Sequence, residues 1–246
     1  MKKDLAIRVQ RVPGQGVLPY KSRRILSAYG KEAVRAGFSV RIHRFATSDG
    51  VVIVTIVCDD SWSAAEYHSA LSRGINQALG RLKANLPDGA IITLKAMKSQ
   101  VPWVCCVPLA ALELPLKLGY EENGNTPLWQ ATLEALALAI ALCKELAAKH
   151  IKATSTTIVA TDDHGDTMSV GLSPNKVARV IRDMRRRGHV IQGMGAGNPV
   201  GYRAILRAMG ILDEDIFDAS NGMQIDGTFS QFAELVQAKR LALTAG

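Results

Sequence analysis

The sequence predicts an α/β protein with a doubly wound, mostly parallel central sheet and helices on both faces. Unbroken β-branched runs, such as Val51–Cys58 and Ser155–Ala160, are typical of strands that a parallel sheet buries on both faces. Segments with apolar residues at helical spacing lie between such runs, and strands alternating with helices indicate a doubly wound sheet. Hydrophobic residues make up 48% of the 246 residues, which is enough for a sizeable core.

The elements follow in order from the first buried run. Val51–Cys58 leads into an amphipathic helix from Ser63 to about Leu86, which Pro87 ends. Further strands are expected at Ala90–Met97, Val101–Val107, Ser155–Ala160, His189–Met194 and Ile216–Ala219. Further helices are expected at Leu128–His150, Asn175–Arg187, Pro199–Met209 and Thr228–Leu243. Prolines in and after Val101–Val107 favour an edge position for that strand.

Charge is distributed unevenly and suggests a division of the chain. Residues 1–45 contain 11 Lys/Arg and 2 Asp/Glu, whereas residues 46–246 are nearly neutral, so most of the net charge of +8 lies in the first segment. We therefore expect a basic N-terminal extension over 1–46, with short strands at Leu5–Val9 and Phe38–Phe45 and one helix at Tyr20–Ala36. An α/β domain over 47–246 follows it. This distribution argues against a generic nucleic-acid-binding domain.

Several classes of protein are not indicated. Asp4 follows the basic start and no apolar segment comes after it, so no secretory signal is visible. The most apolar stretch, Ala135–Cys143, is much shorter than the roughly 20 residues that span a bilayer. The four cysteines show no CxxC spacing and lie among apolar residues, as reduced buried thiols do. We expect a cytoplasmic protein without a membrane span.

Three polar clusters fall where ligands bind in such folds. Asp59, Ser61 and Ser63 follow the first buried strand, Thr126 precedes the long helix, and Asp162 follows the next β-branched strand. In an open parallel sheet, ligands bind beyond the carboxyl ends of the strands. Three hydroxyls and two carboxylates are hard oxygen ligands of the kind that Mg²⁺ prefers. The sequence therefore predicts a divalent-cation site at this edge.

The same residues resemble the metal-ion-dependent adhesion site (MIDAS) of von Willebrand factor type A (vWA) domains. Asp59-x-Ser61-x-Ser63, Thr126 in Gly-Asn-Thr-Pro-Leu, and Asp162 after a strand match that motif in order and spacing over roughly residues 48–243. The resemblance implies a Rossmann-like vWA fold in which Ser61, Ser63 and Thr126 contact Mg²⁺, or Mn²⁺ or Ca²⁺ in its place. Asp59 and Asp162 would hold its waters or bind it directly.

The resemblance also implies a function. An open coordination position would take an Asp or Glu carboxylate from a partner protein, so the chain would be a non-enzymatic binding module. Intracellular bacterial or phage proteins of this type often serve as adaptors beside a MoxR-type AAA+ ATPase, and here that ATPase would be a separate chain. Such adaptors act in metal insertion, complex assembly or stress responses.

Two other functions remain open. A Mg²⁺-dependent phosphoesterase would use Asp59 or Asp60 as nucleophile, but only His164 offers a general base and no lysine occupies a phosphate-binding position. A nucleic-acid role would use residues 1–45 as a basic arm. That segment has few aromatic residues to interleave with its charges, namely Tyr20, Tyr29, Phe38 and Phe45.

Two further motifs have ordinary interpretations. The basic run on Asn175–Arg187, from Arg179 to Arg187, is typical of a solvated helix face. Gly193-x-Gly195-x-Gly197 lacks the full spacing of a dinucleotide loop and any Walker-type lysine, so we expect a turn after a late strand.

Overall fold

The sheet has the predicted doubly wound architecture. The computed structural model describes residues 18–38, 50–97, 103–120, 126–162, 169 and 171–245. Within them, six strands form one sheet in the order β3-β2-β1-β4-β5-β6. Neighbouring strands are parallel except for β2 and β3, which are antiparallel. The predicted fold class is confirmed, and the third strand lies at an edge as its prolines indicated.

The strands are β1 (Val51–Cys58), β2 (Ala90–Ala96), β3 (Val104–Pro108), β4 (Ala153–Thr161), β5 (Val190–Gly195) and β6 (Ile216–Asp218). The α-helices are α2 (Tyr20–Tyr29), α3 (Lys31–Phe38), α4 (His68–Asn85), α5 (Leu128–Ala147), α6 (Pro174–Arg185), α7 (Pro199–Ala208) and α8 (Gly222–Thr244). Short 3₁₀ helices are η2 (Trp62–Tyr67), η3 (Leu109–Ala111) and η4 (Asp213–Asp215). The expected helix from Ser63 thus begins as η2 and continues as α4.

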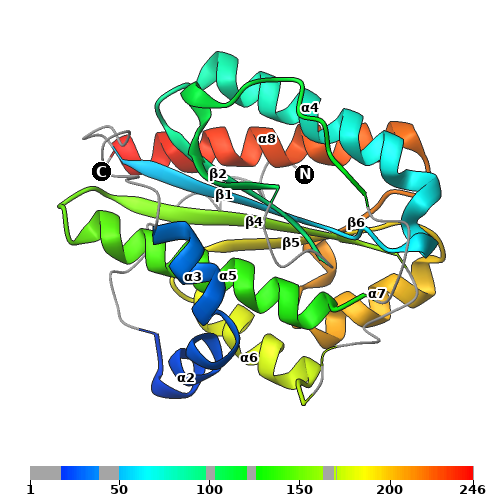
Figure 1. Ribbon diagram of the computed structural model, residues 1–246, viewed down its shortest axis with the longest axis horizontal. Helices are drawn as coiled ribbons and strands as arrows, with labels where there is room; N and C mark the ends of the chain where they lie inside the picture. Colours follow the sequence, from blue (N-terminus) through cyan, green and yellow to red (C-terminus); the bar gives the residue numbers. More distant parts are fainter. Residues whose placement is uncertain are drawn as a thin grey trace.

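Helices cover both faces of the sheet. Figure 1 shows α4 and α8 on one face, and α5, α6 and α7 on the other, with α2 and α3 outside α5. Every residue of β1 is buried because β1 lies between β2 and β4 and is covered from both sides. No helix in the described ranges is long and apolar enough to cross a membrane.

The apolar character of α5 has a structural cause. This helix packs against β1 and β4 on its inner side and against α2 and α3 on its outer side. A helix enclosed in this way needs apolar residues around most of its circumference. It begins at Leu128, as expected, with Pro127 as its N-cap.

The N-terminal helical region divides at Gly30. The sequence predicted one helix over Tyr20–Ala36, but the structure has α2 and α3 with Gly30 between them. A Cβ on Gly30 would lie only 2.1 Å from the Cβ of Ala137, so this residue lets the chain approach α5 closely. Leu5–Val9 and residues 39–45 lie outside the described residues, and Phe38 ends α3. The domain boundary at 46/47 also lies outside them and stays a prediction.

The glycine-rich segment is largely strand rather than turn. Gly193 and Gly195 lie inside β5, and only Gly197, with a φ of 87°, has a turn conformation. A Cβ on Gly195 would lie 1.9 Å from the ring of Tyr202, which α7 presses against this strand. The expected strand His189–Met194 already contained Gly193. The turn expected at Gly195–Gly197 was wrong for Gly195, which belongs to the strand and allows close packing of Tyr202.

Candidate metal site

The end of β1 places three polar residues in a buried position. Asp59, Asp60 and Ser61 are 1%, 1% and 3% exposed, although they directly follow an apolar strand. The Asp59 N–H donates to the Ala160 carbonyl at 2.9 Å, which extends the β1–β4 ladder by one residue. The backbone then turns into η2, so these side chains remain at the carboxyl edge of the sheet.

Hydrogen bonds from two elements fix the Asp59 carboxylate. Its Oδ1 accepts from the Ser61 N–H at 3.0 Å, and its Oδ2 accepts from the Thr161 hydroxyl at 3.0 Å. The first bond closes a local turn of the kind that Asp side chains make with the backbone two residues on. The second bond ties the end of β1 to the end of β4. This carboxylate is therefore held in one orientation.

The serine hydroxyls of the motif lie side by side. Ser61 Oγ and Ser63 Oγ are 3.0 Å apart. Ser63 lies in η2 and is partly buried, so the pair is at the boundary between the sheet edge and solvent. The spacing of two residues thus brings both oxygens to one point.

Thr126 and Asp162 reach the same edge from neighbouring elements. Thr126 is 5% exposed and lies two residues before α5, whose N-terminal end is at the edge where β1 and β4 end (Figure 1). Asp162 is 2% exposed and follows β4 directly. Hydrogen bonds join Asp59, Ser61 and Ser63. Asp162 is linked to Asp59 through its charge, and Thr126 is placed by α5. We call these five residues the metal edge.

Burial of carboxylates at this edge is electrostatically costly. Burial is the main cause that raises the pKa of Asp59, and the nearby charge of Asp162 raises it further, while hydrogen bonds from Ser61 and Thr161 act in the opposite direction. Burial, followed by the nearby charges of Asp60 and Asp59, also raises the pKa of the Cys58 thiol. A cation at this edge would relieve the repulsion between the carboxylates.

The donor set fits a hard divalent cation. It offers hydroxyl and carboxylate oxygens, which Mg²⁺, Mn²⁺ and Ca²⁺ accept, and no sulfur or imidazole. Among the described residues, no three His, Cys, Asp or Glu side chains group together as a metal site.

Sequence reasoning missed the role of Thr161. The β1–β4 register pairs Cys58 with Ala160, and this register brings Thr161 beside Asp59. Only the register carries this signal, because nothing in the local sequence distinguishes Thr161 from other threonines of β4. His68, the first residue of α4, is a packed side chain: its ring stacks on Tyr120 with centroids 3.9 Å apart.

No protein-family model matches the chain, and no curated protein matches it. Solved structures do match. Proximal thread matrix protein 1 from the mussel byssus is 14% identical with a TM-score of 0.53, over 78% of this chain and 47% of that one. A structure of the same protein with a zinc-occupied MIDAS motif is 13% identical with a TM-score of 0.50, over 76% and 46%.

Two bacterial structures also match. The pilus adhesin SpaC from Lactobacillus rhamnosus GG is 12% identical with a TM-score of 0.54, over 78% of this chain and 30% of that one. A von Willebrand factor type A structure from Catenulispora acidiphila is 14% identical with a TM-score of 0.47, over 77% and 43%. The match thus spans less than half of each of these chains. At these identities the likeness concerns the α/β fold alone.

Proposed function

We propose that the protein is an interaction module that binds a partner protein through a divalent cation at the metal edge. One observation carries the proposal: buried oxygen donors from β1, η2 and β4 converge at one edge, with the Ser61 and Ser63 hydroxyls 3.0 Å apart and Asp59 fixed by two hydrogen bonds. The vWA-like fold supports it, because this edge is where open parallel sheets bind ligands.

Each residue has a distinct part in this proposal. Ser61, Ser63 and Thr126 would contact the ion, and Asp59 and Asp162 would hold its waters or bind it. The cation, Mg²⁺ or in its place Mn²⁺ or Ca²⁺, supplies an electrophilic centre with an open position when it is bound. Asp59 enters already oriented by Ser61 and Thr161, so little side-chain freedom is lost on binding.

Charge balance favours a carboxylate as the partner's ligand. Three neutral hydroxyls and two carboxylates leave a divalent ion less neutralised than a site built from carboxylates alone. A partner's Asp or Glu would complete its shell, because hard cations prefer anionic oxygen. The mussel protein with a zinc-occupied MIDAS motif and the SpaC adhesin share this fold, and they support the idea of a binding module.

The partner we propose is a protein with an exposed Asp or Glu, and a MoxR-type AAA+ ATPase in an intracellular bacterial or phage setting is the specific candidate. Affinity capture from a native extract tests the proposal, once with Mg²⁺ and once with EDTA. We expect partners that are retained only with Mg²⁺ and are lost in the Ser61→Ala/Ser63→Ala variant.

Ser69→Ala serves as the matched control, because Ser69 is an exposed serine of α4 outside the metal edge. It should retain Mg²⁺-dependent partners, and circular dichroism should show that all variants are folded. Recovery of the same partners with EDTA as with Mg²⁺ would show that the metal does not bridge them.

A further inference from the structure

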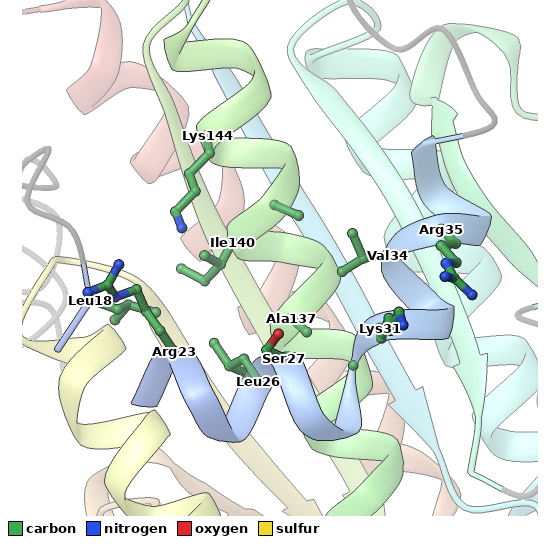
Figure 2. A pocket seen from close by; sticks show the side chains of 12 residues that line it. Leu18, Arg23, Leu26, Ser27, Lys31, Val34, Arg35, Ala137, Ile140 and Lys144 are labelled. Carbon is green, nitrogen blue, oxygen red and sulfur yellow. The ribbon is translucent and has the colours of Figure 1, made fainter. Parts of the chain in front are cut away.

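One pocket lies between α2, α3 and α5, far along α5 from the metal edge. Its volume is about 400 Å³, and its apolar floor includes Leu26 and Ile140. Among the residues that the structure describes, four cations line it, Arg23, Lys31, Arg35 and Lys144, and no acidic residue does. Figure 2 shows Arg23 and Lys144 at one end of this pocket and Lys31 and Arg35 at the other. An anionic ligand is favoured along its whole length.

A second pocket lies on the other side of α2, against α6. Its volume is about 510 Å³, and within the described ranges it too is lined by four cations and no acidic residue. The cations are Lys21, Arg24, Lys176 and Arg179. The sequence suggested two unrelated basic runs, one in the N-terminal segment and one on α6, but the structure brings them together.

The packing of α2 against α6 buries an acidic side chain, so that its charge is not on this surface. Ser22 donates to the Asp183 carboxylate at 2.6 Å in a buried contact. Asp183 is the only acidic residue in α6, and α2 contains none. Tyr29 donates to the Gly171 carbonyl at 3.3 Å and accepts from Lys176 at 3.2 Å, which fixes α2 to the start of α6.

The eight cations are largely available to a ligand. Within the part of the chain that the structure describes, the only acidic partner of these side chains is Glu32, which is 3.0 Å from Arg35 and exposed. Residues 1–17 and 39–49 are themselves net positive, so their charge does not complement the pockets. We call the two pockets and the helix between them the basic flank.

Two tyrosines lie among these cations. Tyr20 is 64% exposed, and the Arg24 guanidinium lies 5.8 Å from its ring centroid. Tyr29 has the Lys176 ammonium 5.5 Å from its ring centroid. The small number of aromatic residues in the N-terminal segment argued against nucleic acid, but both tyrosines of α2 are placed in the cationic pocket.

We propose that the basic flank binds single-stranded nucleic acid. Lysines and arginines on both sides of α2 would contact successive phosphates, and Tyr20 would stack on an unpaired base. An exposed ring favours a single strand because paired bases in a duplex do not offer their faces. This surface is separate from the metal edge, so the proposal does not depend on the proposed metal function.

Fluorescence anisotropy with labelled oligodeoxythymidine and oligouridine, in EDTA, tests the proposal on the full chain. We expect binding of both strands with an affinity that falls steeply as salt is added. Arg24→Glu/Arg179→Glu and Lys31→Glu/Lys144→Glu should each weaken binding at least about tenfold, since each replaces two phosphate contacts by repulsion. Tyr20→Ala should weaken single-strand binding about tenfold and leave duplex binding unchanged.

Lys117→Glu/Lys152→Glu is the matched control, because it makes the same change of net charge at exposed positions outside both pockets. It should bind almost as the unmodified chain does, as should Ser61→Ala/Ser63→Ala. The proposal fails if the control reversal weakens binding as much as the pocket reversals. It also fails if polyglutamate competes as well as the oligonucleotides while Tyr20→Ala has no effect, because the flank would then be a surface for acidic proteins.

Discussion

The metal edge and the basic flank handle charge in opposite ways. At the metal edge, Asp59 and Asp162 are 1% and 2% exposed, and backbone and hydroxyl donors hold Asp59 in place. At the basic flank, cations such as Arg23 and Lys144 extend into solvent from helices, without acidic neighbours among the lining residues. One region concentrates buried negative charge, and the other spreads positive charge over mostly exposed side chains.

This difference determines what each region can recognise. A small cation needs a few oxygens at fixed positions. Buried side chains hold their oxygens in fixed positions, and a bound cation would offset the electrostatic cost of burying the carboxylates. A polyanion needs many cations over a wide surface, and exact placement matters little. The net charge of +8 is a sum over the whole chain, so by itself it describes neither region.

The largest effect that we expect is at the opposite edge of the sheet, where a histidine side chain is buried. This charge environment differs from both regions above. His189 precedes β5, and its Nδ1 lies 2.9 Å from the Ser155 hydroxyl. Burial, with Lys239 and Arg187 nearby, lowers its pKa from 6.5 to about 4. The unfolded chain therefore binds a proton at a higher pH than the folded chain, and stability falls as the pH drops from about 6.5 to 4.

Over this pH range, the free energy of unfolding should fall by about 3 kcal/mol. Lysine and arginine stay charged throughout it, so the basic flank cannot cause the loss. Urea unfolding at several pH values measures it, and His189→Gln should flatten the curve. His150→Gln, at an exposed histidine, is the control; a flattening of equal size in that variant would assign the loss elsewhere.

The next prediction separates two effects of the metal edge on stability: the loss that its carboxylates cause without an ion, and the gain that a bound ion adds. In Mg²⁺ at a hundred times its Kd, the unmodified chain should gain about 2.7 kcal/mol of stability. Asp59→Asn should lose that gain, yet unfold at a higher temperature than the unmodified chain in EDTA, because it removes the repulsion with Asp162. Thermal unfolding with and without Mg²⁺ gives both results. A variant less stable in both conditions would show that the hydrogen bonds of Asp59 outweigh this repulsion.

A smaller effect tests how the basic flank is attached. Gly30→Ala should cost about 2 kcal/mol, because its Cβ would meet Ala137 at 2.1 Å and overpack the contact with α5. Nucleic-acid binding should weaken while Mg²⁺ binding stays unchanged. Gly80→Ala makes the same chemical change in α4 with nothing within 4 Å, and it should not destabilise the protein.

Rescue shows whether the contact itself is responsible. Ala137→Gly removes the other Cβ of the pair, so the double variant should recover part of the stability that Gly30→Ala loses. Urea unfolding of the four proteins gives the coupling between the two positions. Simple addition of the two single losses would mean that Gly30 matters for backbone conformation rather than for this contact.

The smallest effect concerns the cations themselves. Lys31→Glu/Lys144→Glu should change the free energy of unfolding by no more than about 0.5 kcal/mol per site, since both residues are exposed and neither has an acidic partner within the described residues. Chemical unfolding measures this. A large loss of stability would mean that these cations support the fold rather than a ligand.

The fold could be predicted because its strongest signals are local. The unbroken run at Val51–Cys58 indicated a strand covered on both faces, and the prolines around β3 indicated an edge. The break of the first helix at Gly30 was missed, since it serves a contact with Ala137, more than 100 residues away in the sequence. Gly195 was assigned to a turn for a similar reason: its small size matters to Tyr202, which lies outside the local sequence pattern of the strand.

The two regions to which we assign functions differ in how much of each could be predicted from the sequence. The metal edge was visible because its residues follow strand ends, and the topology of a parallel sheet brings such ends together. The hydrogen bond from Thr161 to Asp59 depended on register, which the sequence did not reveal. The basic flank depended on the packing of α2 against α6, and no local pattern links Arg24 with Arg179.

Calorimetric titration of Mg²⁺ into the EDTA-treated and dialysed chain tests the central claim most directly. We expect saturable binding of one ion to the unmodified chain and to Ser69→Ala, and loss of that binding in Ser61→Ala/Ser63→Ala with the fold intact. Equal binding by the folded Ser61→Ala/Ser63→Ala variant, or no binding by the unmodified chain, would contradict a metal site at the end of β1.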